Sequence, residues 1–215
     1  MLESEYIELL DRLRFGGKAA DRNQALKELQ ILELEGNFQA EDLINLLEEK
    51  DFVFQTYAIG AIGRLKLEKG IPSLIRLFQE SNDPLVLPVL LNTFASFKDA
   101  VFVENVLEKV EALLAKIESN PSGGYGFLLE QIIVPALKYL QTAGDRKVEK
   151  TVQHFLNDSD PTVRWHALVT YDKLNLPMSD ETLRQMMNHD KYALVREQAA
   201  VMLEKKKREE NDQSI

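Results

Sequence analysis

One line of residues recurs along this chain at intervals that suit a helical hairpin. It consists of a large apolar residue, a small or apolar residue four positions later and a large apolar residue eight positions later. The five copies are Phe54/Ala58/Ile62, Val86/Leu90/Phe94, Leu129/Ile133/Leu137, Val163/Ala167/Tyr171 and Val195/Ala199/Leu203. Successive copies are 32, 43, 34 and 32 residues apart. A period in the low thirties is typical of two-helix units that bury their apolar stripes only by stacking on one another. We therefore expect an all-α fold, an α-α superhelix of about six helical-hairpin repeats.

The spacing also predicts the domain organisation. A single repeat domain is expected over residues 1–206, with an expanded repeat at 99–142 where the step is 43 residues. The Gly-rich segment at 120–126 within it either returns a lengthened helix or carries a binding function. Residues 207–215 are expected to form a charged, disordered tail because terminal polar segments have few contacts.

Two Asp-Pro pairs predict where second helices begin. They are Asp83-Pro84 and Asp160-Pro161, each placed just before a copy of the recurring line. An aspartate before a helix accepts hydrogen bonds from its free N–H groups, and proline at the next position already has a helical φ. Each pair therefore sets the start of a second helix.

Composition limits the classes of protein that remain. Of the 215 residues, 45% are apolar and none is cysteine, so disulfides and thiolate chemistry are excluded. The chain has no apolar run of about 18 residues, and its start lacks the basic and apolar parts of a secretion signal. We expect a cytoplasmic protein without a membrane partner.

The charge distribution disfavours nucleic acid as a partner. The net charge is −9, with 12 basic and 19 acidic side chains in residues 1–110 and 14 and 16 in residues 111–215. The dense basic cluster at 205–208 is followed directly by Glu209 and Glu210, and we interpret it as the solvated end of a helix. No nucleic-acid partner is expected.

No pattern in the chain predicts catalysis or a cofactor. None of the histidines His154, His166 and His189 has a second histidine three or four positions away to form a metal-binding pair. Ser122-Gly123-Gly124 lacks the Gly-Lys-Ser/Thr ending of a phosphate-binding loop, and there is no Gly-x-Ser-x-Gly nucleophile motif. We expect no enzyme activity, catalytic residue, metal or cofactor.

The motifs Asp160-Pro-x-Val-Arg-x-x-Ala and Val195-Arg196 resemble HEAT repeats, in particular the short bacterial, phycobilin-lyase-type class. In that family the arginine of the Val-Arg pair commonly binds an aspartate of a neighbouring repeat. The resemblance therefore implies a structural ladder in the C-terminal repeats. Its expected members are Asp160, Arg164, Asp190 and Arg196.

The resemblance further implies that the second helices line a concave, partner-binding face. If Val163, Ala167 and Tyr171 point into the core, helical geometry directs other positions of the same helix outward. The predicted binding strip, aligned by repeat, consists of Trp165, Leu168, Val169, Asp172, Gln131, Val134, Lys138, Pro88, Leu91 and Glu197. Trp165 either supplies contact area to a partner or packs against an adjacent helix.

These expectations favour a non-enzymatic scaffold that binds a protein or peptide on its concave face. The alternative is a bilin lyase-like, chromophore-handling or phycobilisome-related protein, which the repeat type implies but cannot establish. A third alternative is a HEAT-like DNA glycosylase, for which Trp165 and Asp172 would supply an aromatic ring and a carboxylate. The acidic balance opposes this third alternative.

Overall fold

The computed structural model describes residues 2–36, 39–97, 100–120, 122, 125–143 and 146–212. All regular secondary structure in these ranges is helical. The chain divides into two compact units, unit 1 (Met1–Phe97) and unit 2 (Lys98–Ile215). The predicted all-α fold of helical-hairpin repeats is confirmed, with three hairpins in each unit.

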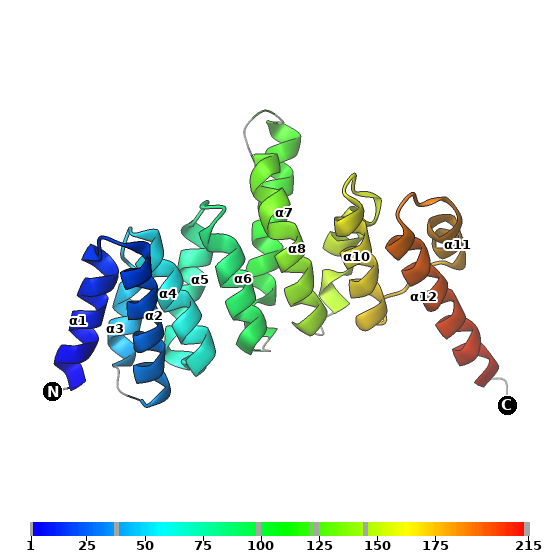
Figure 1. The fold of residues 1–215 in the computed structure, drawn as a ribbon. Coiled ribbons are helices and arrows are strands. Elements are labelled where there is room, and N and C mark those ends of the chain that lie inside the picture. The colour runs from blue at the N-terminus through cyan, green and yellow to red at the C-terminus, as the bar shows by residue number, and fades with distance from the viewer. Residues whose placement is uncertain are drawn as a thin grey trace. The chain divides into compact units, whose positions relative to one another are not determined.

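Unit 1 contains three consecutive helical hairpins, followed from α1 to α6 in Figure 1. They are α1 (Leu2–Phe15) with α2 (Ala19–Leu34), α3 (Ala40–Leu46) with α4 (Phe52–Leu65), and α5 (Ile71–Glu80) with α6 (Val86–Phe97). A short 3-10 turn, Glu68–Gly70, precedes α5. The second helices α4 and α6 pack directly on each other.

Unit 2 repeats the arrangement of consecutive helical hairpins. Its hairpins are α7 (Val103–Ser119) with α8 (Tyr125–Ala143), α9 (Glu149–His154) with α10 (Pro161–Lys173), and α11 (Asp180–His189) with α12 (Ala193–Asp212). Three 3-10 turns, Ala100–Phe102, Arg146–Val148 and Phe155–Asn157, join or extend these helices. The second helix α10 packs between α8 and α12.

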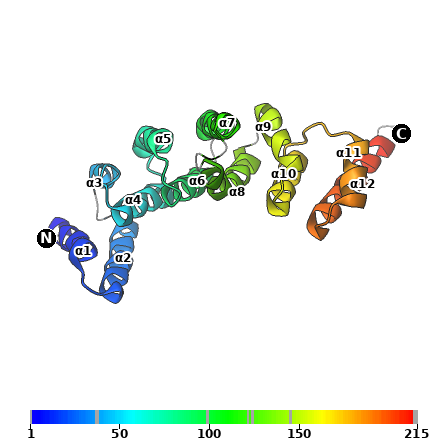
Figure 2. The ribbon, with the colours of Figure 1, turned by 90° about the horizontal axis from the view of Figure 1, so that it is seen from above.

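First and second helices form separate layers within a unit. In the view of Figure 2, α3 and α5 lie on one side of unit 1, and α4 and α6 lie on the other. In unit 2, α7 and α9 likewise lie on the opposite side from α8 and α10. The second helices α4, α6, α8 and α10 therefore each pack against a first helix on one side.

Aspartates precede three of the second helices, and two of them, Asp83 and Asp160, belong to the predicted Asp-Pro pairs. The Asp160 carboxylate accepts a hydrogen bond from the Thr162 N–H over 2.7 Å, and Pro161 occupies the first helical turn. Asp83 accepts from the Leu85 N–H over 2.8 Å, and Asp51 accepts from the Val53 N–H over 2.8 Å. These caps satisfy N–H groups that have no partner inside the helix.

The recurring apolar line forms the core of each unit. All fifteen of its residues are buried, from Phe54 in α4 to Leu203 in α12. Burial of each of the larger side chains stabilises the folded state by about 1.5–3 kcal/mol. The entropy cost of ordering the chain opposes this gain. The line thus identifies the inward face of the second helices correctly.

The hairpin of α7 and α8 is the longest. Its helices have 17 and 19 residues, against 10 and 12 in α5 and α6, and in Figure 1 it extends beyond the neighbouring α9–α10 hairpin. Pro121, Gly123 and Gly124 of the predicted Gly-rich loop lie outside the described residues.

The C-terminal helix differs from the expectation. The predicted disordered tail at 207–215 begins as helix, since α12 continues to Asp212. Lys206, Glu209 and their neighbours are good helix formers, which suits this extension. Even among the longer helices described, none has a stretch apolar enough to cross a bilayer.

Candidate functional site

The second helices of unit 2 share a solvent-facing stripe. On α10 it runs through Thr162, Trp165, Val169 and Asp172, at steps of three, four and three residues. The equivalent positions on α12 include Leu194 and Val201, whose side chains are 44% and 55% exposed. Such steps keep residues on one side of a helix.

We name this surface the unit 2 face. It consists of the exposed or partly exposed side chains of Gln131, Val134, Lys138, Trp165, Val169, Lys173, Leu194, Glu197, Val201 and Glu204. It contains large apolar side chains that contact solvent in the free protein, the kind of surface that partners cover.

The structure exposes most of the predicted strip but not all of it. Gln131, Lys138 and Glu197 are exposed, whereas Val134, Trp165, Val169, Asp172 and Pro88 are partly exposed. Pro88 lies on α6 of unit 1, and the others belong to unit 2.

Leu91 and Leu168 were wrongly assigned to the strip. Both are fully buried, with 0% exposure. Each follows a core position by one residue, which rotates it by about 100° around the helix. Because α10 packs between two neighbours, its buried arc is wider than one apolar stripe and includes Leu168.

Trp165 lies against the buried histidine of the same helix. Its ring meets the His166 imidazole edge to face, with centroids 4.7 Å apart. The Gln141 amide of α8 donates to the His166 carbonyl over 3.2 Å, so this part of α10 is tied to α8. Burial lowers the pKa of His166 to about 4, and the nearby Lys138 and Lys173 contribute. The imidazole beneath Trp165 is therefore neutral at pH 7.

Asp172 joins two helices. Its carboxylate accepts hydrogen bonds from Gln198 and from Lys205 of α12, each over 3.0 Å. Lys205 also donates to Asn175 over 2.9 Å. Asp172 therefore holds α10 and α12 together, and a partner would compete with these bonds to reach it.

The basic cluster at 205–208 is less solvated than the sequence indicates. Besides the contacts of Lys205, Lys206 donates to the Met178 carbonyl over 2.9 Å and to Asp180 of α11 over 2.5 Å. Both lysines line a pocket of about 450 Å³ between the α10–α11 connection and α12, with Leu183 and Met202 among its apolar residues.

One rung of the predicted ladder is present in full. Arg164 of α10 binds the Asp190 carboxylate through Nε at 2.8 Å and Nη2 at 2.9 Å, and it also donates to the Asp158 carbonyl over 2.7 Å. The hydrogen bonds from Arg164 are the main cause that lowers the pKa of Asp190. Arg196 donates to the Asp190 backbone carbonyl over 2.9 Å.

Asp160 does not take part in this rung through its carboxylate. Its side chain caps α10 instead, and its backbone carbonyl accepts from the Arg164 N–H over 3.1 Å. The ladder assignment is therefore correct for the Arg164–Asp190 pair and wrong for the Asp160 side chain.

The unit 2 face carries charges of both signs. Lys138 and Lys173 are close enough to His166 for their positive charges to lower its pKa. His166 lies on the side of α10 that contacts α8. Glu197 and Glu204 lie on α12, on the opposite side. Among the described residues no carboxylate is within 4.0 Å of Lys138 or Lys173, while Glu204 is 3.7 Å from Arg208.

Unit 1 contains a buried polar cluster that sequence reasoning missed. Glu33 of α2, 2% exposed, accepts a short hydrogen bond from the Tyr57 hydroxyl and a bond of 2.9 Å from Arg64, both on α4. The Tyr6 hydroxyl lies 3.4 Å from that of Tyr57. A glutamate between apolar positions of α2 was the available signal, but its partners are more than twenty residues away in the sequence.

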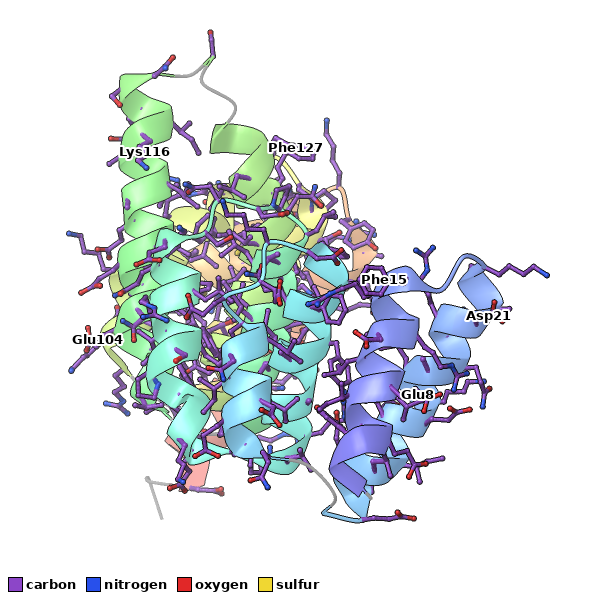
Figure 3. The ribbon with its side chains drawn as sticks, turned by 90° about the vertical axis from the view of Figure 1, so that its left-hand side faces the viewer. Glu8, Phe15, Asp21, Glu104, Lys116 and Phe127 are labelled. Carbon is purple, nitrogen blue, oxygen red and sulfur yellow. The ribbon has the colours of Figure 1, made fainter. Side chains whose placement is uncertain are left out.

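Phe127 is a further exposed residue that the sequence did not indicate. It is 59% exposed and extends from the start of α8 on the side away from α7 (Figure 3). It precedes Gln131 by one helical turn, so both lie along the same side of α8.

Within the described residues, no group of three or more His, Cys, Asp or Glu side chains is placed to hold a metal ion. The unit 2 face offers apolar contact area and charged side chains of both signs.

Comparisons with known proteins agree with this architecture. The profile of the HEAT repeats family matches residues 132–204. The structure is similar to that of the complex of CpcE and CpcF of phycocyanin lyase from Nostoc sp. PCC7120. The TM-score is 0.58 at 18% sequence identity, and the match covers 92% of this chain and 74% of that chain. A search of curated protein sequences gives no significant match. Residues 132–204 thus match the HEAT repeats family, and the chain shares the helical-hairpin repeat fold of this neighbour.

Proposed function

We propose that the protein is a non-enzymatic scaffold that binds a protein or peptide on the unit 2 face. The observation that carries this proposal is the alignment of apolar side chains on neighbouring second helices, with the partly exposed Trp165 and Val169 on α10 and the exposed Leu194 and Val201 on α12. Covering such side chains gains about 25 cal/mol for each Å² of apolar surface removed from water.

The helices that carry this face are fixed before any partner arrives. Asp172 and Lys205 link α10 to α12, and Arg164 links α10 to Asp190 at the end of α11. A surface held in place in this way loses little conformational entropy on binding. The free lysines on one side and the glutamates on the other would orient the partner.

Capture of partners from the lysate of the native host, followed by calorimetry with the purified partner, tests this proposal. We would compare the wild type with Trp165→Ala and with Val201→Glu, which places a charge on an exposed apolar site. A matched control, Tyr192→Ala/Lys150→Glu, removes an aromatic ring and reverses a charge outside the unit 2 face.

The expected result is a partner whose Kd rises at least tenfold, a loss of about 1.4 kcal/mol, for both face variants and stays unchanged for the control. Melting curves must show that the variants remain folded. A partner that binds all variants equally would contradict the choice of face.

A second candidate function is the handling of a bilin chromophore. What supports it is the similarity of the fold to the phycocyanin lyase complex, at 18% identity. A fold of this kind hosts several functions, so the similarity needs a direct test. Incubation of the purified chain with a free bilin should shift the absorption spectrum of the pigment if it binds. An unchanged spectrum at concentrations of about 100 μM would remove this candidate.

A further inference from the structure

A pocket of about 450 Å³ lies between the α10–α11 connection and α12 of unit 2. Sites for small molecules usually have volumes of about 300–1,000 Å³, so this pocket is large enough for a small organic ligand. Its lining residues lie between Tyr171 and Glu209, and none of them belongs to the unit 2 face. It is therefore a candidate site separate from the surface proposed for a partner.

Part of the pocket lining is apolar and buried. Leu176, Leu183 and Met202 line the pocket, and all three are buried. Pro177 and Met178 of the α10–α11 connection add further apolar surface. A methionine side chain is unbranched and polarisable, so it adapts to apolar groups of different shape. This part of the pocket therefore suits an alkyl chain or a small ring.

Two ammonium groups line the same pocket, and both side chains are partly exposed. Lys205 donates to Asp172 over 3.0 Å and to Asn175 over 2.9 Å. Lys206 donates to Asp180 over 2.5 Å and to a backbone carbonyl of the α10–α11 connection over 2.9 Å. Because an ammonium has three N–H groups, these bonds leave one N–H of each lysine for an acceptor in the pocket.

The nearby carboxylates leave this pair of ammonium groups available to an anion. Asp180 also lies 3.6 Å from Arg184, so two cations share this carboxylate. Glu209 lines the pocket as well, but its side chain is exposed, and solvent screens an exposed charge strongly. Hydrogen bonds from an ammonium to a carboxylate are charge-assisted and about twice as strong as those between neutral groups. A ligand carboxylate that accepts from both lysines therefore gains more than it loses by repulsion from Glu209.

We propose that this pocket binds a small molecule with an apolar body and a single carboxylate, such as a medium-chain fatty acid. The carboxylate accepts one hydrogen bond from Lys205 and one from Lys206, and the apolar body covers Leu176, Leu183 and Met202. Because their neighbours already hold both lysines, these side chains lose little entropy when the ligand arrives. The inference goes beyond the proposed function, since it assigns a different site and a different ligand.

NMR of the methionine methyl groups of the full chain tests the site, with octanoate as the probe. Met178 and Met202 line the pocket, whereas Met186 and Met187 of α11 do not. Octanoate should shift the first two signals, with half of the change reached below about 1 mM, and should leave the other two in place. The variants Met178→Leu and Met202→Leu identify the signals. Octylammonium, which has the same chain length and the opposite charge, should cause no saturable shift.

Substitution of the lysines tests the role of the charge. In Lys205→Gln/Lys206→Gln the Kd of octanoate should rise at least tenfold, a loss of about 1.4 kcal/mol. The matched control, Lys191→Gln/Lys207→Gln, changes two exposed lysines outside the pocket and should leave the Kd unchanged. Thermal melts verify that the variants are folded. If the double variant does not fold, the comparison of octanoate with octylammonium on the wild type decides the question.

Four results would overturn the proposal. The first is an absence of shifts at Met178 and Met202 with about 1 mM octanoate, and the second is equal affinity for octylammonium. The third is an equal loss of affinity in the control variant. The fourth is a shift of all four methyl signals together, which would indicate general association of the probe with apolar surface. None of these results bears on the unit 2 face, which the captured partner tests.

Discussion

Arg164 and Asp190 connect consecutive hairpins of unit 2 through two parallel hydrogen bonds, of 2.8 and 2.9 Å. The side chains are only 16% and 8% exposed, so solvent screens the pair weakly. Asp190 also accepts from the Tyr192 N–H over 2.9 Å, and so orders the start of α12. One carboxylate thus sets the position of one hairpin on the next.

We predict that Asp190→Asn lowers the free energy of unfolding by about 2–4 kcal/mol, because Arg164 then keeps its charge without a carboxylate. The pKa of Asp190 is lowered by Arg164. The stabilisation that the ionised Asp190 carboxylate gives to the folded state is therefore present above the ordinary pKa of aspartate. It is lost as the pH falls through the lowered pKa of Asp190 in the folded state. Urea unfolding at pH 7 and pH 3 measures both effects. Glu104→Gln, in an ion pair that is 61% and 69% exposed, should cost less than about 1 kcal/mol. Equal losses for the two variants would contradict the prediction.

In unit 1, Tyr57→Phe is predicted to cost about 1–3 kcal/mol, since it removes a donor from the buried Glu33 carboxylate. Tyr6→Phe should cost less, because its hydroxyl is 3.4 Å from that of Tyr57 and makes the weaker bond. Chemical unfolding of both variants measures which substitution lowers the free energy of unfolding more. If Tyr6→Phe proves the more harmful, the cluster is not centred on Glu33.

The raised pKa values of Tyr6 and Tyr57 lead us to expect a loss of folding stability in alkali. Burial raises the pKa of Tyr6 to about 12 and raises the pKa of Tyr57 as well. The unfolded chain releases these protons near the ordinary tyrosine pKa of about 10, so folding stability should fall as the pH rises from there. Ultraviolet titration should show Tyr6 and Tyr57 ionising only above pH 11 or on unfolding. In Tyr57→Phe one late-titrating group should disappear.

The lowered pKa of His166 leads us to expect a loss of folding stability in mild acid. With its pKa lowered to about 4 by burial and by Lys138 and Lys173, the folded chain takes up this proton later than the unfolded chain does. Stability should therefore decline as the pH falls from about 6.5 toward 4, by on the order of 2 kcal/mol for this group. NMR titration of the imidazole checks the value, and Lys138→Glu should raise it. A His166 that titrates near the ordinary histidine pKa of about 6.5 would contradict the burial argument.

Local patterns predicted the inward side of the second helices and their starts. The recurring apolar line and the Asp-Pro pairs depend only on residues within one helical turn or two, so Val163, Ala167 and Asp160 have the predicted burial or cap. The Arg164–Asp190 pair was predicted because the HEAT resemblance supplied the partner.

What the sequence could not supply was packing between repeats. Leu168 is buried because helices pack on both sides of α10, which one helix pattern cannot reveal. Glu33 meets Arg64 across a separation of 31 residues, and Lys205 meets Asp172 across 33. Such pairs depend on which side chains face each other after stacking. Compared with the predicted strip, the unit 2 face therefore lacks the two buried leucines, Pro88 and Asp172, and it includes Lys173, Leu194, Val201 and Glu204.

Gly60 and Gly63 of α4 differ in their surroundings. A Cβ at Gly63 would lie 2.8 Å from Thr93 Cγ2 and 3.0 Å from Ser96 Oγ, both on α6. Thr93 is buried and Ser96 donates to the Gly63 carbonyl over 3.2 Å, so neither can move without loss. Gly63→Ala should therefore destabilise the chain by about 1–3 kcal/mol, despite the better helix propensity of alanine.

Gly60 provides the matched control because it lies one turn earlier on the same helix. A Cβ there would approach only the Arg64 guanidinium, at 3.1 Å, and a long side chain of this kind can shift. Gly60→Ala should therefore be neutral or stabilising by up to about 1 kcal/mol, through the reduced entropy of the unfolded chain. Thermal and urea unfolding of the two variants compares them directly. Opposite signs would show that α4 and α6 approach each other as closely as the structure has them, whereas a stabilising Gly63→Ala would require a wider spacing between these helices.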